Sequence, residues 1–99
     1  MLGRLLAALM VIAVPTAASA TTECTAKVIR IWAGDGGHVY IFLSGGAAVL
    51  TPSDPNREAA LSLAITAMTT NRTLTVRYSA DAASCSATHF DVVGLYINP

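Results

Sequence analysis

Ser53–Met68 reads SDPNREAALSLAITAM. In this stretch the spacing of the apolar residues changes from the alternation of a strand to the period of a helix. Ser53-Asp54-Pro55 combines a capping residue, an acid and a proline, which is typical of a helix start. Apolar residues recur at i, i+3, i+4 and i+7, which predicts one buried stripe made of Leu61, Ala64, Ile65 and Met68. The alanines of this stretch favour a helix that packs closely on a sheet.

Strands are predicted on both sides of this helix, three before it and two after it. They are Ala26–Trp32, His38–Leu43, Ala47–Thr51, Thr73–Tyr78 and Phe90–Ile97. Glycine turns at Asp35-Gly36-Gly37 and Ser44-Gly45-Gly46 join the first three. Asn71 is expected to end the helix in a left-handed conformation, and Gly94 predicts a bulge or bend in the last strand.

The resulting order, β-β-β-α-β-β, is that of the OB-fold, a five-stranded, partly open barrel. We therefore predict a mostly β domain with one helix. One sheet with one helix packed on it, an α+β sandwich, is the competing architecture. The glycine-containing last strand favours the barrel.

The N-terminus predicts export. One positive charge, Arg4, precedes the apolar run Leu5–Val14, and Ala18-Ser19-Ala20 has the small residues that a signal peptidase recognises. The run is too short to span a bilayer comfortably. We interpret residues 1–20 as a cleaved signal and residues 21–99 as a single domain that is secreted or periplasmic.

The charge balance excludes one large class of partner. After residue 20 the chain has five basic and six acidic residues, a net charge of −1. Without a basic field, nucleic acid is not expected as a partner. No second long apolar segment follows, so the domain is not expected to be embedded in a membrane.

Two cysteines, Cys24 and Cys85, lie in the predicted mature chain. An even number of cysteines in an exported protein favours one intramolecular disulfide. Closing a loop of this length is worth roughly 4 kcal/mol in the chain-entropy treatment. A free thiol and a disulfide to another chain remain open as alternatives.

The pattern of elements resembles the subtilase-cytotoxin-B-like family of small exported bacterial proteins. A Cys opens the first strand in Cys24–Val28, and a glycine turn leads into the aromatic strand Gly36–Ile41. An alanine-rich helix leads into Thr73–Tyr78, and the second Cys precedes Val92–Ile97. The resemblance implies an OB-fold and a non-enzymatic toxin B subunit that binds a cell-surface glycan, as a dimer or a pentameric ring. The chain is shorter than typical toxin subunits, and no glycan-contacting residue of that family matches a position here.

Enzymatic motifs are absent from the sequence. The histidines, His38 and His89, lack close ligand spacing, and no serine lies in a Gly-x-Ser-x-Gly elbow. We therefore expect no catalytic residue, metal or cofactor. A small hydrolase using His38 or His89 is the weakest alternative.

A set of aromatic and cationic residues is the candidate ligand or interface surface. If Val39, Ile41 and Leu43 face the core, the other side chains of that strand face outward. The surface then consists of Arg30, Trp32, His38, Tyr40 and Phe42. The opposite parity, in which these rings fill the core, is equally compatible with the pattern.

The sequence thus favours a secreted binding module for a glycan or a protein. The alternative is a periplasmic structural or inhibitory protein with one protein partner.

Overall fold

A computed structural model describes residues 20–99. The predicted signal lies outside this range except for its last residue, Ala20. Within residues 20–99 the chain has no helix with the length and apolar character needed to cross a membrane.

Six strands form one sheet in the order β5-β3-β2-β1-β4-β6. Their bounds are β1 Thr22–Gly34, β2 His38–Leu43, β3 Gly46–Leu50, β4 Thr73–Tyr78, β5 Thr88–His89 and β6 Val92–Ile97. A 3-10 turn, η2, spans Asp35–Gly37, and one helix, α1, spans Arg57–Thr69. The class predicted from the sequence, mostly β with one helix, is confirmed.

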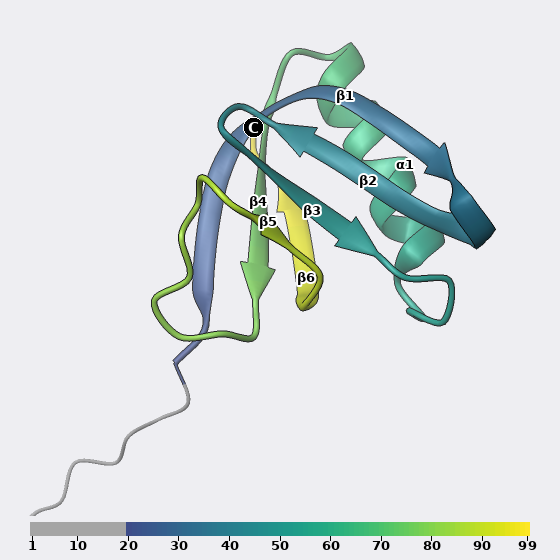
Figure 1. The fold of residues 1–99 in the computed structure, drawn as a ribbon. Coiled ribbons are helices and arrows are strands. Elements are labelled where there is room, and N and C mark those ends of the chain that lie inside the picture. The colour runs from purple at the N-terminus through teal and green to yellow at the C-terminus, as the bar shows by residue number, and fades with distance from the viewer. Residues whose placement is uncertain (1–19) are drawn as a thin grey trace, which may run out of the picture.

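The long strand β1 gives the sheet its curl. Thr22–Lys27 pairs with β4, whereas Val28–Gly34 pairs with β2. The register shifts between Val28 and Arg30, so Ile29 is an extra residue that bends the strand. The sheet becomes a half-barrel with α1 packed inside the curve (Figure 1).

The prediction of five strands is wrong, because a sixth short strand, Thr88–His89, lies just before the predicted last strand, Phe90–Ile97. Thr88–His89 pairs in parallel with β3, and Val92–Ile97 pairs antiparallel with β4. Only Phe90 and Asp91 separate these two strands, although they lie at opposite ends of the sheet order. The chain therefore turns a corner between β5 and β6. At this corner the Asp91 carboxylate accepts hydrogen bonds from Ser79 and Ala80. The expected irregularity near Gly94 is present, as a register shift between Arg77 and Tyr78.

The helix turns a different face to the core from the one predicted. Its buried residues are Ala60, Ala64 and Ala67, while Ile65 and Met68 are 45% and 39% exposed. The small alanine side chains let the helix axis come close to the sheet, and the larger residues are left at its margin. The helix does end as predicted, because Asn71 adopts a φ of 58° just beyond it.

The structure settles which side of β2 is buried, a question that the sequence pattern left open. Val39, Ile41 and Leu43 are buried, whereas His38, Tyr40 and Phe42 are partly exposed. On β4, Leu74, Val76 and Tyr78 are buried as predicted. Thr75 is buried as well, and its hydroxyl lies 2.7 Å from that of Thr25 and accepts a hydrogen bond from Asn98 Nδ2 at 2.9 Å.

Candidate functional site

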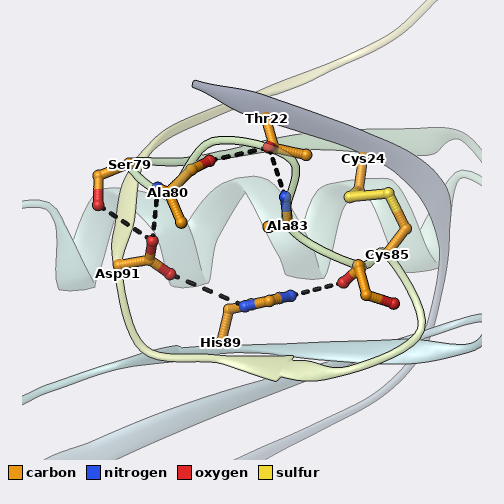
Figure 2. Close-up of polar contacts among 9 residues, drawn as sticks. Thr22, Cys24, Ser79, Ala80, Ala83, Cys85, His89 and Asp91 are labelled. Carbon is orange, nitrogen blue, oxygen red and sulfur yellow. Dashed lines mark hydrogen bonds and ion pairs between the residues drawn. A yellow bond between two sulfur atoms is a disulfide. The ribbon is translucent and has the colours of Figure 1, made fainter. Parts of the chain in front are cut away.

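A disulfide attaches the loop 79–87 to the first strand. Cys24 and Cys85 are bonded, with their α-carbons 5.5 Å apart, which confirms the intramolecular pairing and removes the free-thiol alternative. The Thr22 hydroxyl donates to Ala80 O at 2.8 Å and accepts from Ala83 N at 2.9 Å. Two residues of β1 thus hold the loop at three points (Figure 2).

Asp91 and His89 tie the same loop down from its other end. Asp91 Oδ2 accepts hydrogen bonds from Ser79 Oγ at 3.0 Å and from Ala80 N at 2.8 Å. His89 Nε2 donates to the carbonyl oxygen of Ser84 at 2.5 Å, while its Nδ1 lies 4.0 Å from Asp91 (Figure 2). The histidine ring also packs on Tyr78, with centroids 4.4 Å apart.

These contacts change the acidity of two groups. Partial burial by itself would raise the pKa of Asp91, but the hydrogen bonds from Ala80 and Ser79 outweigh it and hold the pKa below its ordinary value. Burial, together with the nearby charge of Asp91, raises the pKa of Tyr78 to about 12. The network is therefore a structural clamp for the loop whose strength depends on an ionised Asp91.

The two histidines do not form a common site. His89 pairs with Ala48, and Ala48 pairs with Ile41, three residues along β2 from His38. The two histidines are thus separated by two strand spacings and roughly 10 Å along the strands. Among the side chains that the structure describes, which do not include that of Asp35, no three of the His, Cys, Asp and Glu types gather closely enough to hold a metal ion.

Four of the five candidate surface residues form one continuous row, which we call the aromatic row: Arg30, Trp32, Tyr40 and Phe42. The Arg30 guanidinium lies 4.6 Å above the Phe42 ring. Phe42 stacks on Tyr40 at 5.9 Å, and Trp32 meets Tyr40 edge-on at 5.4 Å. Because the alternate residues of β2 face α1, the row lies on the side of the sheet away from the helix.

The row has an accessible end at Trp32, whose side chain is 41% exposed. A shallow depression of about 340 Å³ beside it is lined by Arg30, Ile31, Trp32 and Phe42. Arg30 keeps hydrogen-bond donors available beside the rings, and Tyr40 carries a hydroxyl. This surface combines flat apolar faces with polar edges, which suits a partner of the same mixed character.

The fifth candidate, His38, is at the start of β2, opposite Gly34. It lines a different cavity, the hairpin-tip pocket, which lies between the β1–β2 turn and the first turns of α1 and has a volume of about 410 Å³. The pocket is lined by the apolar side chains of Ala33, Val39 and Leu61 and, besides His38, by the polar side chains of Arg57, Glu58 and Ser62. Sequence reasoning missed this pocket, because its two sides are about 20 residues apart and neither carries a motif.

A second surface cluster was also missed. Glu23 accepts hydrogen bonds from Arg77 at 2.6 Å and 2.9 Å and from the Tyr96 hydroxyl at 3.0 Å. The bonds from Arg77 and then Tyr96 hold the pKa of Glu23 below its ordinary value. All three groups are solvent-exposed, so this bridge across β1, β4 and β6 adds little stability.

Comparisons of the chain with protein-family models, with curated proteins and with solved structures find no match. Any functional assignment consequently depends on the geometry of the aromatic row and the fold that presents it.

Proposed function

We propose that this chain is an exported, non-enzymatic binding domain of the OB type, which binds a glycan through the aromatic row. The observation that carries the proposal is the unbroken contact series from Arg30 through Phe42 and Tyr40 to Trp32 on the open side of the sheet. Three neighbouring rings and a cation, presented on rigid strands, need little reordering when a ligand binds.

The strand order supports the OB assignment. Strands β1 to β4 and β6 lie in the order β3-β2-β1-β4-β6, and the helix connects β3 to β4. In this interpretation β5 and β6 are two halves of one bent last strand, which would join the two edges of a barrel.

Export is supported by the disulfide. A bond between Cys24 and Cys85 persists in an oxidising compartment, such as the periplasm or the extracellular space. The predicted signal at residues 1–20 agrees with that location.

A glycan suits the row because a sugar ring has both an apolar C–H face and hydroxyl groups at its edge. The face packs on Trp32 or Tyr40, and the hydroxyls accept hydrogen bonds from Arg30. The toxin-subunit resemblance is part of the same proposal, including assembly into a dimer or a pentameric ring.

The test is a glycan array probed with the oxidised protein, followed by titration of each hit with the fluorescence of Trp32, the chain's single tryptophan, as the signal. Because W32A has no tryptophan, its binding is measured by calorimetry. We expect its affinity for the glycan to fall by about tenfold or more, the range of an interface hot spot. F90A is the matched control, since Phe90 is 57% exposed but lies outside the row.

Three results would count against the proposal. The first is the absence of glycan binding combined with one stoichiometric protein partner that W32A releases, which would favour the inhibitory or structural alternative. The second is a hydrolytic activity lost in an H38A/H89A double variant. The third is a native mass spectrum that shows only monomers, which would exclude assembly into a dimer or a pentameric ring.

A further inference from the structure

We propose that the hairpin-tip pocket is a second binding site, which takes a small monocarboxylate with an apolar body. This site is distinct from the aromatic row, because none of the four residues of the row lines the pocket, although Gly34 and His38 of its lining adjoin the row. Ala33 and Val39 are cross-strand partners on the core face, whereas Trp32 and Tyr40 are partners on the outer face. Binding in one site therefore does not require the other.

The size and lining of the pocket suit a small organic molecule. Its volume of about 410 Å³ falls within the range of roughly 300–1,000 Å³ found for ligand pockets. The lining joins the apolar side chains of Ala33, Val39 and Leu61 to the polar side chains of His38, Arg57, Glu58 and Ser62. An occupant thus needs an apolar body with its polar group at one end.

Arg57 supplies the recognition of the polar end. Its side chain is partly buried, and its Nη1 donates to Gly37 O at 2.6 Å, which uses one of five N–H donors. No carboxylate among the described side chains lies within ion-pair distance of this guanidinium. A planar guanidinium that is anchored on one side binds a carboxylate with its remaining donors.

Gly37 makes this position of Arg57 available. Gly37 has a φ of +99°, and a Cβ there would lie 2.8 Å from Arg57 Nη1. The positive φ favours glycine at this position, and the carbonyl group of Gly37 holds the guanidinium beside the pocket.

The neighbouring polar groups narrow the ligand class. The Ser62 hydroxyl can donate a further hydrogen bond to an anion. Glu58 lines the same pocket with a negative charge, which disfavours a dianion such as phosphate. Beside the His38 ring, the guanidinium of Arg57, the hydroxyl of Ser62 and the negative charge of Glu58 together favour a singly charged carboxylate.

The first test maps binding on the unaltered protein. The oxidised, ¹⁵N-labelled protein is titrated with 4-methylpentanoate, 4-methylpentylamine and inorganic phosphate in separate NMR experiments. We expect the carboxylate alone to shift the backbone amides of Ala33, Gly37, Val39 and Leu61. No shifts with the carboxylate, equal shifts with the amine or phosphate, or shifts centred elsewhere would overturn the proposal.

The second test uses variants, each checked for folding by its NMR spectrum. R57Q should weaken 4-methylpentanoate binding by about tenfold or more, since it removes a charge-assisted contact. R72Q is the matched control, because Arg72 is exposed and lies outside the pocket. E58Q should bind the carboxylate at least as tightly as the parent, because it removes a negative charge beside the ligand. A loss of binding in E58Q would contradict the proposal that Arg57, and not Glu58, holds the carboxylate.

W32A separates this site from the aromatic row. The variant should keep its affinity for 4-methylpentanoate within about twofold, whatever it does to glycan binding. A parallel loss of carboxylate affinity in W32A would show that the two sites are one.

Discussion

The indole ring of Trp32 lies over Gly34, two residues further along β1. A Cβ built on Gly34 would come within 2.9 Å of the ring carbon Cζ2. The glycine thus leaves the space in which the only tryptophan of the chain packs against its own strand.

Substitution of Gly34 by alanine should displace this ring without unfolding the domain. Gly34 has extended backbone angles, so the added methyl group acts only through its contact with the indole. We expect G34A to shift the Trp32 emission maximum and to weaken glycan binding, while the far-ultraviolet circular dichroism stays unchanged.

Gly94→Ala is the control for that change, because a Cβ at Gly94 meets nothing within 4 Å. An emission shift of equal size in G94A would mean that the effect is not local to Trp32.

Removal of the disulfide should cost a large part of the stability. The chain-entropy treatment gives about 4 kcal/mol for two cysteines 61 residues apart. For a domain of this size, that corresponds to a fall in Tm of roughly 20 °C. Urea unfolding of C24A/C85A, compared with the parent protein, measures the difference in the free energy of unfolding.

Chemical reduction of the parent protein provides the comparison for that variant, since it breaks the bond while the sulfur atom of the buried Cys24 stays in place as a thiol. If reduction leaves the Tm within a few degrees of the oxidised value, the bond is not a main source of stability.

Asp91 should make the stability fall in acid. Its pKa is lower in the folded protein than in the unfolded chain. Its contribution is therefore present at pH values above the unfolded pKa, near 3.8, and is lost as the pH falls through the lower folded value. The Tm measured from pH 6 down to pH 2 should decline less steeply for D91N than for the parent protein.

D81N is the matched control, because Asp81 lies in the same loop and forms no hydrogen bond with the described residues. Glu23, whose pKa is also lowered, leaves some acid sensitivity in D91N. Identical acid profiles for D91N and D81N would exclude the proposed clamp.

The helix face can be tested with two neighbouring substitutions. Ala64 is fully buried, so A64L should destabilise the domain by roughly 1–3 kcal/mol through overpacking. I65A should change the free energy of unfolding by much less, because Ile65 is 45% exposed. Denaturant unfolding measures both, and a larger loss in I65A would reverse the assigned orientation of α1.

Local pattern was enough to predict much of this protein. Clean alternation predicted the strand Thr73–Tyr78, and a run of β-branched and aromatic residues between two glycine turns predicted His38–Leu43, both with their observed bounds. Asn71 marked the end of the helix, and the two cysteines indicated the disulfide. These features depend on residues whose chemistry acts within a few positions, or on a pair with only one partner available.

The sequence pattern did not predict the short strand β5 or the face of the helix that points inward. Thr88–His89 contains only two residues and pairs with a strand 40 residues earlier, so no periodicity marks it. The helix buries Ala60, Ala64 and Ala67, while its residues Leu61 and Leu63 pack against the core as partly buried side chains. This orientation depends on the sheet that the helix packs against and not on the helix sequence alone.

For the candidate sites, too, some features follow from the sequence and others only from the tertiary structure. The sequence by itself determined which side chains bear chemistry: the rings and cation of β1 and β2, the two cysteines, and the absence of a catalytic motif. Only the tertiary structure decided that Tyr40 and Phe42 face away from the core and contact Trp32 and Arg30. It alone brought Arg57 to Gly37 across 20 residues, because a pocket is formed by surfaces that meet only when the helix packs on the sheet.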